Sequence, residues 1–116
     1  MLNMTIDEIK DDVRFFKIPI LFFKLYVDCL SIEEIFLYCL LRDRLELSKK
    51  NKAQFSDKHG NLYVIFTIKE VCNIFNCGHD KATKLFRDLE KYGLILRCNQ
   101  GKGKSSIIYV HDYYYW

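Results

Sequence analysis

The chain has 116 residues, half of them apolar and 16% aromatic, and its net charge is only +3. This length suits one domain with a hydrophobic core, and so high an apolar content excludes a disordered tail. Its apolar stretches are too short to cross a bilayer and its acidic N-terminus lacks the features of a secretory signal, so we expect a soluble, cytoplasmic protein with no membrane partner.

The first residues form a predicted acidic arm, residues 1–13. In this arm, Thr5 and Glu8 have the spacing of a capping box that could open a short helix. Pro19 would interrupt any helix running on from the arm. We therefore place the domain at residues 14–112 and treat the aromatic residues 113–116 as a C-terminal tail, which either completes the core, forms a ragged end or self-associates.

Two capping boxes predict the next helices. Ser31 and Glu34 form the first, and apolar residues then recur at helical spacing to about residue 47. A polar loop is expected over residues 48–60, with a turn at residues 57–60, and a strand over residues 62–66. Thr67 and Glu70 form the second box, which opens a short helix that ends near Asn76.

A third helix is predicted over residues 79–91, and Gly93 is suited to end it. Its short, glycine-containing connection to the preceding helix predicts a helix-turn-helix. Strands at residues 94–98 and 107–110 flank a glycine-rich, basic hairpin tip from Asn99 to Lys104. The order helix, strand, helix, helix, strand, wing, strand indicates an α+β fold, the winged helix-turn-helix.

Positive charge is concentrated in this last part of the chain. Residues 78–104 carry seven basic and three acidic side chains, a net charge of +4, whereas the other residues carry 11 basic and 12 acidic ones, a net charge of −1. Such a basic segment is typical of a nucleic-acid-binding surface.

The third predicted helix has a cationic face opposite its apolar stripe. A turn of 100° per residue places Asp80, Lys84, Arg87 and Lys91 there, with Lys81 and Thr83 at the edges. Such a helix fits the major groove of DNA, while the wing follows the backbone or enters the minor groove. The candidate DNA contacts are His79, Asp80, Lys81, Thr83, Lys84, Arg87, Lys91, Gln100, Lys102 and Lys104.

Other interpretations of these residues remain open. A basic helix face is also typical of a solvated surface that binds nothing, and Asp80 repels phosphate although it can accept from a cytosine amino group. Cys72, Cys77 and His79 lack the ligand spacing of a zinc site, so we expect no metal and reduced, mostly core thiols. The histidines have no nucleophile or carboxylate at catalytic spacing, and no glycine loop precedes a helix, so we expect neither an enzyme nor a cofactor.

The sequence also resembles a known family, the N-terminal domain of RepA-type plasmid replication initiators of Gram-positive bacteria. The similarity extends over residues 15–111. The residues that carry it are 16–19, Leu30, Ser31, 40–44, Leu47, Ser48, 57–60, Tyr63, Phe66, Thr67, Cys77, 81–84, Leu89, Glu90, 93–95, Gln100, Gly101, Ile108 and Tyr109.

The resemblance implies a dimeric winged helix that binds repeated double-stranded sequences at a plasmid origin and helps start replication, without metal or nucleotide. The arm and residues 15–30 are alternative dimer surfaces. This chain departs from the family pattern at residues 54–56, where a tryptophan-like residue is usual, and at residues 104–106, where a proline is usual in the wing. Family members also have a C-terminal domain that recruits host replication proteins, so the chain is either a fragment or a short relative that binds DNA without initiating.

Two further functions are compatible with the same pattern. A transcriptional regulator would use the same fold and the same recognition helix. A winged helix can also serve as a protein-interaction module whose basic face binds no DNA, which the modest net charge permits.

Overall fold

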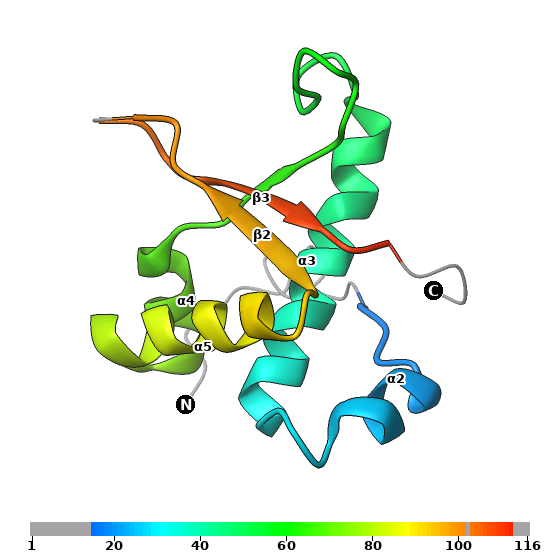
Figure 1. Cartoon of the computed structure of the whole chain (residues 1–116), viewed down its shortest axis with the longest axis vertical. Coiled ribbons are helices and arrows are strands. Elements are labelled where there is room, and N and C mark those ends of the chain that lie inside the picture. Colours follow the sequence, from blue (N-terminus) through cyan, green and yellow to red (C-terminus); the bar gives the residue numbers. More distant parts are fainter. Residues whose placement is uncertain (1–14, 102, 113–116) are drawn as a thin grey trace, which may run out of the picture.

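A long central helix organises the structure (Figure 1), a computed structural model that describes residues 15–101 and 103–112. In the view of Figure 1, α4 and α5 lie to one side of α3, α2 lies to the other, and the sheet crosses α3. The predicted order of elements is confirmed, with one additional helix before it. The elements are α2 (Ile20–Tyr26), α3 (Ile32–Lys50), β1 (Val64–Ile65), α4 (Ile68–Phe75), α5 (His79–Lys91), β2 (Ile95–Cys98) and β3 (Ile107–Val110).

The central helix α3 begins at the predicted capping box. Ser31 Oγ accepts from the backbone N–H of Glu34 at 3.1 Å, and Glu34 Oε1 accepts from the N–H of Ser31 at 2.8 Å. The helix ends three residues later than expected, at Lys50, because Ser48 is only 3% exposed and continues the buried face of the helix. Polar composition predicted a loop there, but burial keeps the last turn helical. Tyr38, fully buried in α3, donates its hydroxyl to the carbonyl of His111 after β3.

The sheet is antiparallel with the order β1-β3-β2, and Val64 pairs with Ile108 while Leu96 pairs with Tyr109. The expectation of a strand over residues 62–66 was too long. Leu62 instead forms an isolated bridge with Ser56, so β1 keeps two residues. The wing strands are confirmed.

The helix α2 was not predicted from the sequence. Apart from Lys24 its residues are apolar or aromatic, so they show no amphipathic period, and only Phe22 is buried. The ring of Phe22 stacks on that of Tyr38 in α3, with 4.7 Å between centroids. Pro19 precedes the first helical residue, a position that tolerates its missing N–H.

The loop between α3 and β1 is organised by Asp57. This carboxylate accepts from the backbone N–H groups of Asn61 and His59 at 2.8 and 2.9 Å and from the hydroxyl of Tyr109 at 2.9 Å. The hydrogen bond from Asn61, with those from Tyr109 and His59, lowers the pKa of Asp57 to about 2. The predicted turn is confirmed, with Gly60 at φ +82°. The loop therefore keeps a defined shape against β3.

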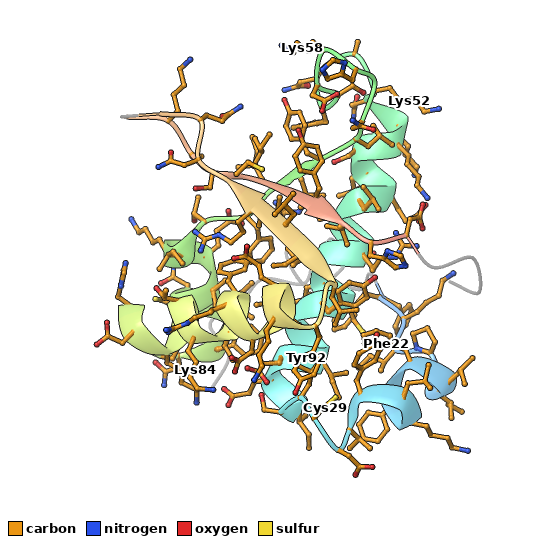
Figure 2. All side chains as sticks on the ribbon, viewed as in Figure 1. Phe22, Cys29, Lys52, Lys58, Lys84 and Tyr92 are labelled. Carbon is orange, nitrogen blue, oxygen red and sulfur yellow. The ribbon has the colours of Figure 1, made fainter. Side chains whose placement is uncertain are left out.

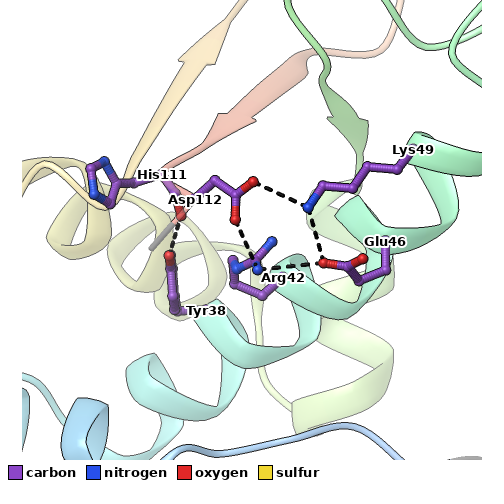
Figure 3. A network of polar contacts seen from close by, with 6 residues as sticks. All are labelled: Tyr38, Arg42, Glu46, Lys49, His111 and Asp112. Carbon is purple, nitrogen blue, oxygen red and sulfur yellow. Dashed lines mark hydrogen bonds and ion pairs between the residues drawn. The ribbon is translucent and has the colours of Figure 1, made fainter. Parts of the chain in front are cut away.

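A buried arginine ties the end of β3 to α3 (Figure 3). The side chain of Arg42 is 2% exposed, and its Nη2 lies 3.0 Å from Asp112 Oδ1 and 3.4 Å from Glu46 Oε1. Lys49 Nζ closes the network at 3.1 Å from Asp112 and 3.2 Å from Glu46. A buried guanidinium is tolerated only when carboxylates compensate its charge, so Asp112 holds the residues directly after β3 against α3.

The cysteines are free thiols in different environments. Burial raises the pKa of Cys39 to about 12, as expected of an inert core thiol. Cys29 is exposed, so the expectation of core positions is wrong for that residue. Within residues 15–101 and 103–112, no helix is long and apolar enough to cross a membrane.

Replacement of Asp112 by Asn is expected to lower the free energy of unfolding by about 1–3 kcal/mol, because buried Arg42 loses the nearer of its two carboxylate partners among the described residues. Chemical denaturation at neutral pH measures this. Asp28→Asn makes the same chemical change at an exposed residue without an ion pair among the described residues, and should leave the midpoint unchanged. Equal stability of the two variants would contradict the role given to Asp112.

Candidate nucleic-acid interface

The turn between α4 and α5 sets the direction of α5. Asn76 ends α4 in the left-handed conformation at φ +49°, and the backbone N–H of Cys77 donates to the carbonyl of Cys72 at 3.1 Å. These features close the helix end and redirect the chain within three residues. Gly78 then caps α5 without a side-chain hydrogen bond, so the first-turn amides of α5 have no side-chain acceptor at their cap. The predicted helix-turn-helix is therefore present.

The helix α5 has the two faces that the sequence predicts. Its stripe of Ala82, Leu85, Phe86 and Leu89 is at most 4% exposed. The opposite face is in solvent. The exposed residues on it are Asp80, Lys84, Arg87 and Lys91.

One edge of α5 faces the beginning of α3 and forms ion pairs there. Lys81 Nζ lies 2.9 Å from Glu33 Oε1. Within α5, Lys84 Nζ lies 2.6 Å from Asp88 Oδ2, and this hydrogen bond raises the pKa of Lys84. Two of the predicted DNA contacts thus already have acidic partners.

A carboxyl pair lies beneath these lysines. Glu34 is 3% exposed, its buried Oε2 has no donor among the described residues, and the neighbouring polar group is the carboxyl of Asp88. Burial and the hydrogen bond with Asp88 raise the pKa of Glu34, while the hydrogen bonds with Glu34 and Lys84 lower the pKa of Asp88. Of the two carboxyl groups, Glu34 therefore holds its proton more tightly than Asp88 does.

The remaining predicted residues of α5 differ in the contacts that they make within the protein. Thr83 donates its hydroxyl to the carbonyl of His79 at 2.9 Å, and His79 Nδ1 lies 3.9 Å from the carboxylate of Asp80. Lys91 Nζ lies 5.7 Å from the centre of the Tyr92 ring. Among the described residues, Arg87 has neither an acidic partner nor an aromatic ring beneath it.

The wing tip depends on two glycines in conformations that other residues rarely adopt. Gly101 has φ +116° and Gly103 has φ +80°. Asn99 Oδ1 accepts from the N–H of Gly101 at 3.0 Å, and Gln100 and Lys104 are exposed. Lys102, also a predicted contact, lies outside the described residues.

The wing and the start of α5 point toward the same edge of the molecule. In Figure 1, α5 and β2 diverge from a common corner at the end of α5, and both lead to the left of the view. Gly93, at φ +71°, makes this corner and confirms the predicted helix end. Figure 2 shows Lys84 on α5 at one end of the molecule and Lys52 and Lys58 on the distant loop.

Arg97 is not among the DNA contacts predicted from the sequence. Its guanidinium lies 4.6 Å from the centre of the Phe86 ring, so it connects β2 to α5. Strand alternation was the available signal, because Arg97 shares a sheet face with buried Ile95 and should point toward the helices.

The predicted site residues can thus be grouped by their positions. His79, Asp80, Thr83, Lys84, Arg87 and Lys91 are brought together on α5, Gln100 and Lys104 lie on the wing, and Lys81 is directed to α3. The described residues contain no group of three side chains suited to hold a metal ion.

Comparison with known proteins gives a family and one curated relative. Residues 14–115 match the family described as the replication initiator protein A (RepA) N-terminus. A 41 kDa protein of Lactobacillus helveticus is 36% identical over 64 residues, which are 55% of this chain and 18% of that protein. The chain thus spans less than a fifth of the curated relative that it matches.

Solved structures with the same fold are also similar in sequence. A structure described as a Rep-DNA complex is 33% identical, with a TM-score of 0.68 over 96% of this chain and 84% of that one. A structure described as an MDR initiator is 33% identical, with a TM-score of 0.66 over 94% and 84%. The N-terminal domain of a DNA-binding protein is 31% identical, with a TM-score of 0.66 over 97% and 84%. The winged-helix fold is therefore shared with these proteins.

Replacement of Asp88 by Asn should lower the pKa of Glu34, because Glu34 stays buried but no longer faces a negative carboxylate. A carboxyl-carbon NMR titration of the isolated protein measures this pKa. Asp80→Asn removes an exposed acid from the same helix and should leave the pKa of Glu34 as it is in the wild type. A pKa of Glu34 that does not respond to Asp88→Asn would disprove the carboxyl pair.

Proposed function

Because this chain belongs to the family of replication initiator protein A (RepA) N-termini, we propose that it binds the repeated double-stranded sequences of a plasmid replication origin. The observation that carries the proposal is the exposed cationic face of α5, with a basic wing leading to the same edge of the molecule. A relative of this fold is described as a Rep-DNA complex, which supports the proposal.

The recognition helix in this proposal is α5. Its width fits the major groove, where side chains of its exposed face reach base edges. Arg87 is our first choice for a base contact, because its guanidinium has no acidic partner among the described residues and can bind a guanine with two hydrogen bonds. The remaining α5 contacts in this proposal are His79, Asp80, Thr83, Lys84 and Lys91.

Phosphate contacts are assigned to the wing and to the lysines of α5. Gln100 and Lys104 are exposed at the wing, and Lys102 lies between them in the sequence. Lys81 and Lys84 must exchange Glu33 and Asp88 for a phosphate, so each contributes less than a free lysine would. The uncapped first turn of α5 can also accept a phosphate.

We further propose that the domain is a homodimer that associates through α2. Most of its side chains are apolar and solvent-exposed: Ile20 is 73%, Leu25 57% and Leu21 52% exposed, and neighbouring Ile18 and Val27 about 40%. With Phe23, which is 37% exposed, they form a contiguous apolar surface, and such surfaces mark protein–protein interaction sites. In Figure 1, α2 lies away from the edge to which α5 and the wing point, so a second copy there leaves that edge free.

The remaining roles follow from the family. We propose that the domain acts in the cytoplasm by binding DNA and not by catalysis. Any contact with host replication proteins belongs, in this proposal, to a C-terminal domain of the kind that family members carry. The match covers 18% of the length of the curated relative.

Arg87→Met should weaken binding to the plasmid's origin repeats by about 1–3 kcal/mol, because one bidentate base contact is lost. Fluorescence anisotropy with repeat and scrambled duplexes over a salt series measures this. Lys52→Met removes one charge at the far end of α3 and should leave the affinity unchanged. No wild-type binding at low salt would reject DNA binding, and equal affinity for scrambled DNA would reject recognition of repeats. If the protein binds the repeats specifically but the plasmid still replicates in cells that lack it, the result would favour a transcriptional regulator.

Leu25→Asp should convert the dimer to monomers, because it places a charge in the apolar interface. Sedimentation equilibrium of the full chain measures the association constant. Leu96→Asp is the control, since Leu96 is equally exposed, at 56%, but lies on β2. A monomeric wild type, or a dimer that tolerates Leu25→Asp, would refute the α2 interface.

A further inference from the structure

Arg97 occupies the angle between α5 and the wing. It lies in the middle of β2, opposite Ile108 of β3, and its guanidinium is held 4.6 Å from the centre of the Phe86 ring. Phe86 is fully buried and belongs to the recognition helix. A cation stacked on an aromatic face has a fixed plane, so the donors of Arg97 have a defined direction.

Packing alone does not explain an arginine at this position. The Nε atom of Arg97 is buried without a hydrogen-bond partner among the described residues, and an unsatisfied buried donor is unfavourable. A methionine would cover Phe86 equally well without that cost. The described residues also form no ion pair with Arg97, although the side chain is partly exposed.

Arg44 provides a comparison within the same molecule. Its guanidinium also stacks on a ring, 4.9 Å from the centre of Phe66. However, Arg44 donates to the carbonyl of Ile65 at 3.1 Å and pairs with Glu70 at 3.4 Å, so its donors are used within the protein. The donors of Arg97 have no such partners in the part of the chain that the structure describes.

The geometry of DNA indicates what Arg97 meets. A single sugar-phosphate strand separates a major groove from the neighbouring minor groove. If α5 enters the major groove and the wing reaches the adjacent minor groove, that strand must pass through the angle between α5 and β2. The angle begins at Gly93, and α5 and β2 diverge from there (Figure 1). Arg97 lies within it, because it belongs to β2 and its guanidinium contacts Phe86 of α5.

We propose that Arg97 binds a backbone phosphate of the strand that passes between α5 and the wing. The inference rests on the proposed function, because it requires α5 and the wing to contact DNA. The guanidinium matches a phosphate with two parallel hydrogen bonds, and its position on Phe86 fixes the wing relative to the recognition helix. On α5, Thr83 and Glu90 lie about one turn to either side of Phe86, and Glu90 is half-buried. Because the carboxylate of Glu90 repels a phosphate, the phosphate must approach Arg97 from its exposed side.

The first test is Arg97→Met, which keeps the apolar stem over Phe86 and removes the charge. Affinity for a labelled duplex of origin repeats should fall about tenfold or more, and the slope of log K against log salt should become shallower by about 0.9, the value of one phosphate. Arg97→Lys should restore the slope but only part of the affinity, because an ammonium ion cannot form the bidentate pair. Thermal unfolding of each variant verifies that the domain is folded.

Arg44→Met is the matched control, because it also removes an arginine that is stacked on an aromatic ring. The Arg44 side chain, however, contacts β1 and α4 and not the wing. This variant should keep the affinity and the salt slope of the wild type. If Arg44→Met and Arg97→Met change both equally, or if Arg97→Met changes neither, the phosphate contact is refuted. Failure of the wild type to bind any duplex would instead reject the proposed function itself.

A second measurement changes the DNA and leaves the wild-type protein unaltered. A neutral methylphosphonate is placed, one position at a time, along the strand between the two contacted grooves. One position should weaken wild-type binding about tenfold and have little further effect on Arg97→Met, because the two changes remove the same contact. Additive losses at every position would overturn the assignment.

Discussion

The burial of α5 against α3 and α4 is the constraint on which the rest of the structure depends. Phe86 and Leu89 are fully buried, and each such side chain contributes about 1.5–3 kcal/mol to stability. Because protein interiors are close-packed, α5 cannot rotate about its axis without losing these contacts. The same packing therefore decides which side chains of α5 face solvent, and the cationic surface is a consequence of the core.

The N-terminal end of α3 adds an electrostatic constraint to this packing. Glu33 pairs with Lys81, and Asp88, which neighbours buried Glu34, pairs with Lys84. These contacts fix one edge of α5 and reduce its free positive charge. In the part of the chain that the structure describes, Lys81 and Lys84 of α5 are thus paired with carboxylates, whereas Arg87 and Lys91 form no ion pair. The net charge of the segment consequently overstates the number of cations that are free to meet a phosphate.

Much of the fold could be predicted because its signals are local. A capping box is formed by residues three positions apart, so Ser31 and Thr67 marked the starts of α3 and α4 correctly. Gly93 likewise ended α5, because a left-handed residue favours glycine. The boundaries that failed depend on distant partners. The last turn of α3 is kept by burial of Ser48, β1 is shortened by the bridge of Leu62 to Ser56, and α2 is anchored by Phe22 against Tyr38.

Within the site, the exposed face of α5 could be predicted from the sequence, because helical periodicity places Asp80, Lys84, Arg87 and Lys91 opposite the apolar stripe. The same is true of the wing, whose glycines adopt left-handed conformations. Tertiary packing, in contrast, establishes which of these charges are free and which residue joins the wing to α5. Lys81 meets Glu33 and Arg97 meets Phe86 because elements distant in sequence pack together, and spacing along a chain carries no information about such partners.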